Sequence, residues 1–197
     1  MNRRAVLSVV LVATLLATQA MAERLVRPVT DVTTIGGPVG ACQVAFRCDP
    51  TITGGNVAVR QALVRFDLQG EPEDRALTVR VYPVTAPWSF GVPRVVYDAE
   101  LWSRTEVDLR HSGPVVMDLT NLVKEIVEHG MTSYGFVVAA GPAAEGMTQG
   151  EAARFSGLSS ATMEVTWRRT PESPAEAQHG RQGQRKAAVH RTAAQQG

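Results

Sequence analysis

The chain has 197 residues, enough for one globular domain of ordinary size but too few for a large multidomain enzyme. Its formal net charge is only +1, which argues against a nucleic-acid partner. The first 22 residues hold two arginines, and the last 27 hold four basic and two acidic side chains. Residues 23–170 therefore carry a net charge of −3, a mildly acidic middle between basic ends.

The amino end has the pattern of a secretory signal peptide. Arg3 and Arg4 precede an apolar run over residues 5–17, and Ala20-Met21-Ala22 forms an A-x-A cleavage site. The apolar run is shorter than the 20 or so residues that a membrane-spanning helix needs. We therefore expect a signal peptide over residues 1–22, export to the periplasm or the extracellular space, and no membrane span in the mature protein.

The two cysteines lie near the expected mature amino end. Weak strand signals at 25–34 and 44–47 flank Cys42, and five residues separate it from Cys48. With no other cysteine and no histidine nearby, an exported chain predicts a structural disulfide rather than a metal site. Two free thiols are the alternative if strand geometry holds the cysteines apart.

The middle of the chain is dominated by strand patterns. In residues 161–168 apolar Ala161, Met163, Val165 and Trp167 alternate with polar side chains, as in a half-buried antiparallel strand. Residues 62–68 and 77–81 alternate in the same way, and the continuously apolar 134–140 predicts a strand buried on both sides. Shorter strands are expected at 115–119 and 152–156.

Only one stretch has the period of a helix. Leu119, Leu122, Val123, Ile126 and Val127 form one apolar stripe, with Thr120 or Asn121 available as a cap and Gly130 as a left-handed end. A short amphipathic helix is expected to plug an edge or an end of the sheets. The whole pattern predicts an all-β fold, a jelly-roll-like antiparallel β-sandwich with one short accessory helix over residues 23–170.

Two segments are candidates for ligand binding. If residues 98–104 form a strand, Asp98, Glu100, Trp102 and Arg104 share one face that can hydrogen-bond hydroxyls and stack on a sugar ring. The same pattern fits an ordinary solvated face with Trp102 covering a sheet edge. The loop 86–91 carries Trp88 and Phe90, which either stand exposed for stacking or tuck under the sandwich.

Catalytic and metal-binding motifs are absent from the sequence. It has no G-x-S-x-G elbow, no H-E-x-x-H and no phosphate-binding glycine loop. His111 in a turn and His129 at a helix end fit structural or exposed roles better than catalysis. We expect no catalytic residue, no metal and no cofactor, although a hydrolase or lyase using Asp98 and Glu100 is a third reading.

The final segment, residues 171–197, has only one aliphatic side chain larger than alanine and no aromatic one. It cannot bury enough surface to offset its ordering entropy and is expected to be a disordered basic tail. Such a tail is either simply solvated or in contact with anionic surfaces.

Three stretches resemble the DNRLRE domain family, secreted β-sandwich modules related to carbohydrate-binding modules. They are Gln61–Leu68, Met117–Val123 followed by Tyr134–Val138, and Phe155-Ser156 before the closing strand. The resemblance spans about residues 57–168 and is weakest around Trp88 and Trp102, where the expected ligand contacts lie. It implies a jelly-roll-like sandwich with polysaccharide or surface binding as its commonest role, and fold-determining roles for Arg65, Phe66, Asp118 and Thr120.

These observations together predict a non-catalytic, exported module that binds carbohydrate or another extracellular polymer. The predicted contacts are Asp98, Glu100, Trp102, Arg104, Trp88 and Phe90. The alternative is a structural or adhesive surface protein that acts through protein–protein contacts.

Overall fold

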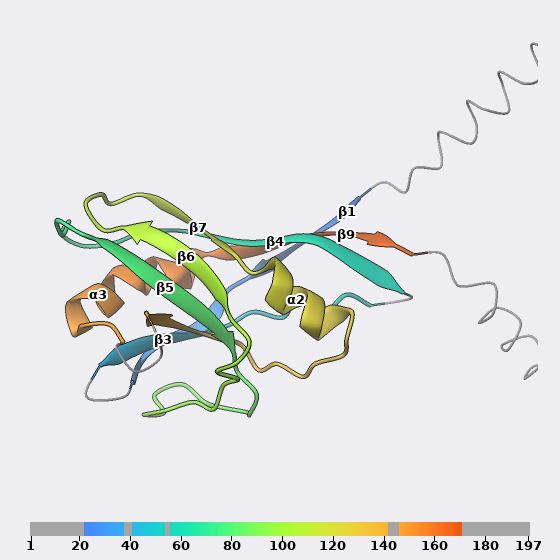
Figure 1. Ribbon diagram of the computed structural model, residues 1–197, viewed down its shortest axis with the longest axis horizontal. Helices are drawn as coiled ribbons and strands as arrows, with labels where there is room; N and C mark the ends of the chain where they lie inside the picture. Colours follow the sequence, from blue (N-terminus) through green and yellow to red (C-terminus); the bar gives the residue numbers. More distant parts are fainter. Residues whose placement is uncertain (1–21, 38–40, 54–55, 142–145, 171–197) are drawn as a thin grey trace, which may run out of the picture.

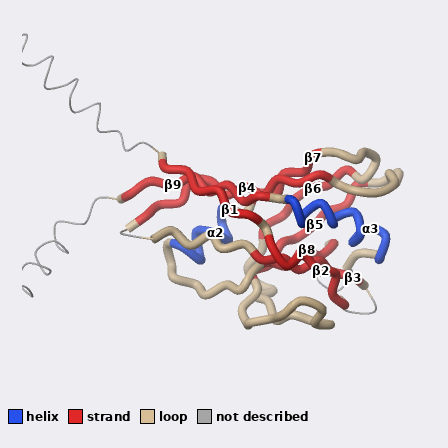
Figure 2. The backbone as a smooth tube through the Cα atoms, turned by 180° about the vertical axis from the view of Figure 1, so that it is seen from behind, coloured by secondary structure: helices blue, strands red, loops and turns tan. Residues whose placement is uncertain are grey.

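The computed structural model describes residues 22–37, 41–53, 56–141 and 146–170, which form two antiparallel β-sheets packed face to face (Figures 1 and 2). The predicted tail lies outside these residues, and so does the predicted signal peptide except for Ala22. None of the described helices is long and apolar enough to cross a membrane.

The first sheet has four strands in the order β1-β9-β4-β7, and the second has five in the order β2-β3-β8-β5-β6. The strands of the first sheet are β1 (Glu23–Pro28), β9 (Thr162–Arg169), β4 (Val57–Asp67) and β7 (Pro114–Asp118). Those of the second are β2 (Thr30–Gly36), β3 (Cys42–Arg47), β8 (Phe136–Ala140), β5 (Ala76–Pro83) and β6 (Ser103–Asp108).

The topology confirms the predicted all-β, jelly-roll-like sandwich. Apart from β2, which adds an edge, four strands of each sheet pair in the jelly-roll order, and the first strand β1 pairs with the last strand β9. The chain crosses from one sheet to the other several times. It does so most directly at Val29, the single residue between β1 and β2, so one flank of the sandwich is closed by a corner of the chain.

The main core lies between the two sheets and is filled by alternate residues of the strands. The predicted inward face of β4 is confirmed, because Ala62, Val64 and Phe66 are buried together with Leu68 just beyond the strand. On β9, the neighbour of β4 in the same sheet, Met163, Val165 and Trp167 are buried beside them, as their alternation predicts. At ~25 cal/mol per Å² of apolar area, this burial is the main favourable term in the stability of the fold.

A second apolar cluster lies on the outer face of the five-stranded sheet. The segment 84–97 folds over that face, and its Trp88 packs with Ile35, Ala45 and Val137 from three different strands. Tyr97 contributes the polar end of the cluster, since its hydroxyl receives a 3.2 Å hydrogen bond from buried Gln43. This covering explains why all five residues of β8 are buried, as their unbroken apolar run predicts.

The predicted helix is present as α2 (Thr120–Val127), and it protects an exposed sheet edge. Strand β7 pairs with only the second half of β4, which leaves the first half of β4 without a strand partner on that side. There the Thr120 hydroxyl accepts from the backbone N–H of Ala62 at 3.0 Å, and the Glu128 carboxylate from that of Val59 at 2.6 Å. Side chains of the helix segment thus replace a neighbouring strand.

The short strand predicted over 152–156 is wrong, because this segment is helical. It forms the end of α3 (Gln149–Arg154) and the start of the 3₁₀ helix η2 (Phe155–Ser160). Thr148 and Glu151 form a capping box that starts α3. Arg154 then anchors it, since its buried guanidinium donates to the carbonyl oxygens of Gln69, Leu109 and His111.

The predicted disulfide between Cys42 and Cys48 is also wrong, because both cysteines are free thiols. Cys42 begins β3 and Cys48 directly follows its end. Six residues of extended chain place their Cα atoms roughly 20 Å apart at ~3.3 Å per residue. A disulfide requires less than about 7 Å, so the strand itself holds the two thiols apart.

Candidate functional site

The strand predicted over residues 98–104 begins only at Ser103, so the expected four-residue face does not form. Asp98 accepts a 2.9 Å hydrogen bond from the backbone N–H of Glu100, a local turn that competes with extended structure. Asp98 and Glu100 therefore precede the strand, whereas Trp102 directly adjoins it and Arg104 lies within it. The structure brings only Trp102 and Arg104 together, as lining residues of one hollow.

Trp102 is partly exposed, and an arginine side chain stacks on its ring. Its relative exposure is 39%, and the guanidinium carbon of Arg80, on the neighbouring strand β5, lies 4.2 Å from the indole ring centroid. The strand register places Arg80 directly opposite Arg104, two like charges that would repel. Stacking of Arg80 on Trp102 and pairing of Arg104 with Glu106 give each cation a favourable contact.

On the outer face of the five-stranded sheet, Glu106 contacts both Arg104 on its own strand β6 and Thr78 on the neighbouring strand β5. The hydrogen bond from Arg104 holds the pKa of the Glu106 carboxyl below its usual range, and a second one from Thr78 acts in the same direction. The carboxylate therefore stays ionised in neutral solution. Arg104 is consequently oriented along the strand rather than free in solvent.

On the flank opposite the chain corner, β6 and β7 end the two sheets on the same side and lie next to each other (Figure 1), joined by the turn 109–113. Two hollows lie along the line between them, and we call this line the edge groove. The first, about 310 Å³, is lined by Trp102, Ser103 and Arg104 facing Asp118, Thr120 and Asn121. The second, about 360 Å³, includes Glu106, Asp108 and His111 facing Gly113, Pro114 and Val116.

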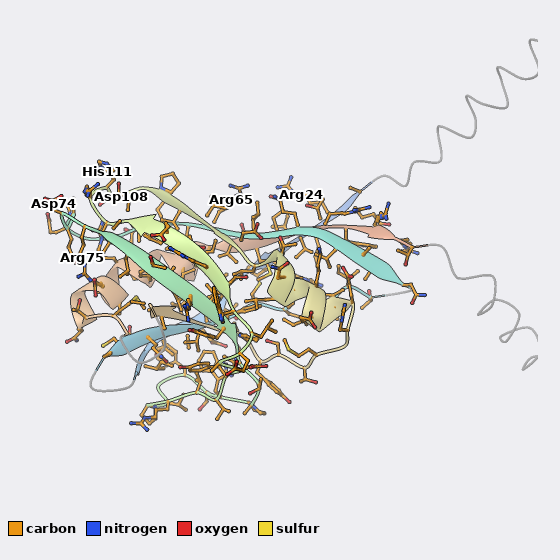
Figure 3. All side chains as sticks on the ribbon, in the orientation of Figure 1. Arg24, Arg65, Asp74, Arg75, Asp108 and His111 are labelled. Atoms are coloured by element: carbon orange, nitrogen blue, oxygen red, sulfur yellow. The ribbon has the colours of Figure 1, made fainter. Side chains whose placement is uncertain are left out.

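The edge groove is acidic. Its lining carries Arg104 against the three carboxylates of Glu106, Asp108 and Asp118, a net charge of −2 with His111 neutral. His111 Nε2 lies 3.9 Å from Asp108 Oδ2, at the turn that joins β6 to β7 (Figure 3). Arg154 fixes this turn from below through the carbonyl oxygens of Leu109 and His111. Arg154 thus holds the turn at one end of the groove in place. The net negative charge of the lining disfavours polyanions.

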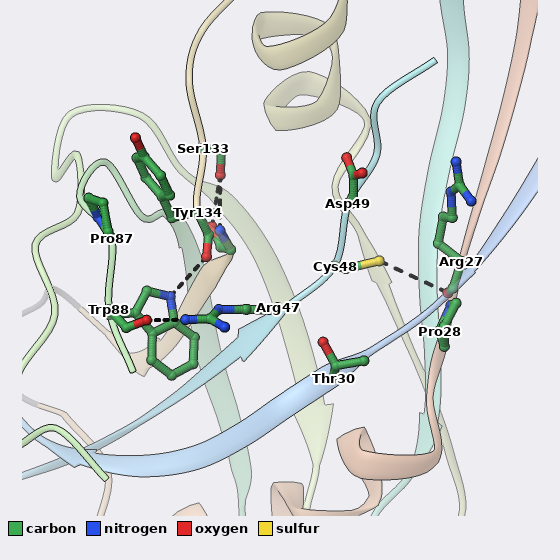
Figure 4. A pocket seen from close by; sticks show the side chains of 11 residues that line it. Arg27, Pro28, Thr30, Arg47, Cys48, Asp49, Pro87, Trp88, Ser133 and Tyr134 are labelled. Atoms are coloured by element: carbon green, nitrogen blue, oxygen red, sulfur yellow. Dashed lines mark hydrogen bonds between the residues drawn. The ribbon is translucent and has the colours of Figure 1, made fainter. Parts of the chain in front are cut away.

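A larger cavity lies at the closed flank, where β1 turns into β2. We call it the corner pocket; its volume is about 480 Å³, and four segments distant in sequence build it. Figure 4 shows Arg27 and Pro28 on one side, Trp88 and Arg47 on the other, and Thr30 between them. Cys48, Asp49, Pro87 and residues 133–135 complete the wall. Its size and largely apolar lining are those of a small-molecule site.

Trp88 forms one wall of this pocket and is fixed from several directions. Its indole N–H donates to the Tyr134 carbonyl at 2.8 Å, and the guanidinium carbon of Arg47 lies 4.7 Å from the ring centroid. Arg47 also donates to the Trp88 carbonyl oxygen. Only 8% of Trp88 is exposed, whereas Phe90, two residues further on, is 70% exposed. Of the two aromatic residues in the loop, Trp88 is therefore buried and Phe90 is exposed to solvent.

Arg47 is positioned in turn by Asp31, with 2.9 Å between Nη1 and Oδ2. Asp31 has a φ of 51°, the left-handed region that non-glycine residues rarely adopt, and it lies where the β2–β3 register shifts. A strained backbone and a bulge thus aim this carboxylate at Arg47. Such local strain persists only where the surrounding structure imposes it.

Cys48 lines the pocket as an inert thiol. The pKa of its thiol is raised to about 12, chiefly by burial and also by the neighbouring Asp49 carboxylate, while Arg27 acts in the opposite direction. Asp49 itself has a pKa below its usual range, chiefly because Thr51 donates hydrogen bonds to it. At neutral pH the pocket therefore holds a neutral thiol beside a charged carboxylate, which is not the arrangement of a cysteine nucleophile.

Within the described part of the chain, no three His, Cys, Asp or Glu side chains gather as a metal site would require. His129 lies at the end of α2, 3.6 Å from Glu125, and His111 is in the turn already described. In comparisons with known proteins, the chain matches no family model and no curated protein. The class that the fold defines is a jelly-roll β-sandwich, and the two flanks are its candidate sites.

Proposed function

We propose that the protein is a non-catalytic, exported β-sandwich module that binds carbohydrate or another extracellular polymer along the edge groove. The observation that carries the proposal is the partly exposed Trp102 indole, backed by Arg80, at the mouth of a polar hollow. An indole with one wet side beside hydrogen-bonding groups suits a sugar ring, which has an apolar face and polar edges.

The shape of the groove supports a chain-like ligand. The six residues of β6 span about 20 Å at ~3.3 Å per residue, and the two hollows lie along this length. Its net charge of −2 favours neutral polymers, or polymers with amino groups, over polyanions. The exposed side-chain amide of Asn121 offers donors and an acceptor without added charge.

Export and membership in the DNRLRE family belong to the same proposal. Export rests on the signal-peptide pattern of residues 1–22. The family resemblance rests on three stretches whose described residues build strands and helices: β4, the β7–α2 segment with β8, and the η2–β9 segment. These stretches build the core and the β4 edge, which agrees with fold-determining roles for Phe66 and Thr120.

A structural or adhesive surface protein is the second candidate. Phe90 is 70% exposed and Val96 63% exposed, both on the segment that covers the outer sheet face. Exposed apolar side chains on an anchored loop suit contact with a protein partner. A catalytic role for Asp98 and Glu100 has less support, because neither carboxylate lines the two hollows of the edge groove.

Affinity electrophoresis tests the proposal directly. Protein purified from cells that express the full chain, including residues 1–22, is run through gels that contain a neutral, an amino-substituted or an anionic polysaccharide. We expect retardation by a neutral or amino polymer, and loss of at least about tenfold in affinity for Trp102→Ala. Phe90→Ala is the matched control, an exposed aromatic residue outside the groove, and should run like the wild type.

Two results would contradict polymer binding. One is unchanged mobility in every gel. The other is equal retardation of wild type and Trp102→Ala, which would place the contact elsewhere. If Phe90→Ala instead abolishes binding to a purified surface protein, the result favours the structural or adhesive function over polymer binding.

A further inference from the structure

The last part of the chain carries a block of positive charge to which the proposed function gives no role. Its two acidic residues, Glu172 and Glu176, come first, and its basic residues all follow them. These are Arg181, Arg185, Lys186 and Arg191, so residues 181–191 have a net charge of +4 with His190 neutral. We call residues 181–191 the basic segment. Cations without an intervening acid are attracted to a surface of opposite charge.

The edge groove has carboxylates that the sandwich does not neutralise. Glu106 is paired with Arg104, whereas Asp108 has only His111 near it. Asp118 accepts hydrogen bonds from Thr120, and among the described residues no cation pairs with it. Asp108 and Asp118 are both exposed, and they line different hollows of the groove. Cations spaced along an extended chain could therefore meet one carboxylate in each hollow.

The groove also has room for the aliphatic part of a basic side chain. The second hollow, of about 360 Å³, is lined by Pro114, Val115 and Val116 as well as by its carboxylates. Arginine and lysine side chains place their methylene groups on such apolar surface and keep their charged ends in water. The site is thus a hollow with apolar walls and acidic ends rather than a group of carboxylates alone.

The basic segment begins within reach of the groove. β9 ends at Arg169, which pairs with Val57 at the start of β4, and Asp118 pairs with Leu63, further along β4. A rise of ~3.3 Å per residue along β4 and two strand spacings of ~4.8 Å place Arg169 roughly 22 Å from Asp118. Arg181 follows Arg169 by 12 residues, a length of chain that spans up to about 40 Å. The first basic residue can therefore reach the first hollow, and the later ones can reach the second.

We propose that the basic segment binds in the edge groove of its own molecule, with its cations at Asp108 and Asp118. Attachment to the sandwich stabilises this contact, because a short tether gives an effective concentration in the millimolar range. Ion pairs too weak to join two separate molecules are then formed within one chain. The contact is electrostatic and weakens as salt is added.

Binding of the basic segment also affects polymer binding, a consequence that rests on the proposed function. Trp102 and Asp118 line the same hollow, so a polymer stacked on Trp102 and a cation at Asp118 compete for that space. A polymer must therefore displace the basic segment. Neutralising the segment should make polymer binding tighter, and this gain should shrink at high ionic strength.

The three tryptophans of the chain provide a reporter for each region. Trp88 lines the corner pocket, Trp102 lies at the edge groove, and Trp167 is 6% exposed in β9 away from both. The ¹⁵N-labelled protein therefore has three indole N–H resonances, which Trp→Phe variants assign. A contact in the first hollow should move the Trp102 resonance and leave the other two in place.

The first experiment compares the full-length wild type with a neutralised variant at low salt and without any polymer. The neutralised variant carries Arg181→Gln, Arg185→Gln, Lys186→Gln and Arg191→Gln. We expect the Trp102 resonance to differ between the two proteins, and the difference to vanish in about 1 M salt and to be independent of protein concentration. The control variant, Glu172→Gln with Glu176→Gln, changes two charges of the opposite sign and should keep the wild-type contact.

The second experiment changes the groove instead of the basic segment. Asp108→Asn and Asp118→Asn are combined, because asparagine keeps the oxygen that accepts from the backbone N–H groups of Arg110 and Thr120. In this background, neutralising the basic segment should move the Trp102 resonance less than a third as far as in the wild type. Asp74→Asn is the matched control, since Asp74 is exposed and lines neither hollow, and it should leave the full shift.

Three results would overturn the contact. They are an unmoved Trp102 resonance in the neutralised variant, an undiminished shift in the groove variant, and a shift that grows with protein concentration, which would assign the contact to a second copy. Unmoved Trp88 and Trp167 resonances show that each variant is folded.

Polysaccharide gels test the competition separately. The neutralised variant should bind a retarding neutral polymer at least threefold more tightly than the wild type, and equal affinity would refute competition. If no gel retards the wild type or the neutralised variant, the proposed function fails, whereas the Trp102 comparison still decides whether the basic segment occupies the groove.

Discussion

The two flanks of the sandwich are built from the same kinds of residue but in opposite ways. On the closed flank the chain crosses directly from β1 to β2, and Trp88 is buried against Arg47. On the opposite flank the longer turn 109–113 joins β6 to β7, and Trp102 is partly exposed and stacks on Arg80. A tryptophan stacked with an arginine is thus a buried wall on one flank and a partly exposed surface on the other.

The charges of the two flanks differ as well. The lining of the corner pocket has a net charge of +1, whereas the lining of the edge groove has a net charge of −2. A mildly acidic domain therefore carries local regions of both signs. Its whole-chain charge of +1 describes neither of them.

Removing each tryptophan in turn tests whether Trp88 and Trp102 differ in their contribution to stability. Trp88→Ala should lower the free energy of unfolding by about 4 kcal/mol, because it leaves a cavity under the covering segment and an unpaired Tyr134 carbonyl. Trp102→Ala should lower it by less than about 1 kcal/mol, since its ring is partly exposed. Urea unfolding measures both, and equal losses would show that Trp102 is as structural as Trp88.

Arg154 supports the far end of the edge groove. Arg154→Ala should destabilise the protein by about 3 kcal/mol, because three carbonyl oxygens lose a buried charged donor. The control is Arg110→Ala in the same turn, an exposed residue paired with Asp74, which should change stability by less than about 0.5 kcal/mol. If the two variants unfold alike, Arg154 does not anchor the turn.

Cys48 gives the closed flank a characteristic pH dependence. Its folded pKa of about 12 exceeds the unfolded value of 9.0, so the folded state keeps the proton that the unfolded state loses between these pH values. The free energy of unfolding should therefore fall as pH rises from 9 toward 12, and fall less in Cys48→Ala. Thiol titration provides a separate check: two free thiols in the unfolded, unreduced protein agree with the structure, and none would restore the disulfide.

A modest effect is expected at Asp31. Asp31→Asn should cost about 0.5–1 kcal/mol, because asparagine tolerates the left-handed backbone and only the partly exposed ion pair with Arg47 is lost. Asp31→Ala should cost more, since alanine tolerates that backbone poorly. Equal stability of the two variants would mean that the backbone at residue 31 is not strained.

Much of the fold could be predicted from periodicity. The alternation in β9, the unbroken apolar run of β8 and the stripe of α2 each report which faces are buried, and the structure confirms them. The helix α3 was missed although Thr148 and Glu151 carry the capping-box signature, because the segment after them is short and apolar like a strand. At residues 98–104 the hydrogen bond that the Glu100 backbone N–H donates to the Asp98 carboxylate forms a local turn in place of the expected strand.

The corner pocket could not be predicted in the same way. Its lining comes from residues 27–30, 47–49, 87–88 and 133–135, which only the jelly-roll topology brings together. No local motif marks any of these segments. The position of Asp31 at a bulge and the ion pair between Asp31 and Arg47 likewise depend on contacts between neighbouring strands.

Polymer contact at Trp102 and the edge groove can be followed through the indole N–H resonances of the three tryptophans. A soluble neutral or amino oligosaccharide from a polymer that retards the protein is titrated into the ¹⁵N-labelled full chain. We expect the Trp102 resonance to shift while those of Trp88 and Trp167 stay in place. A shift confined to Trp88 or Trp167, or no shift of Trp102 at saturation, would contradict it.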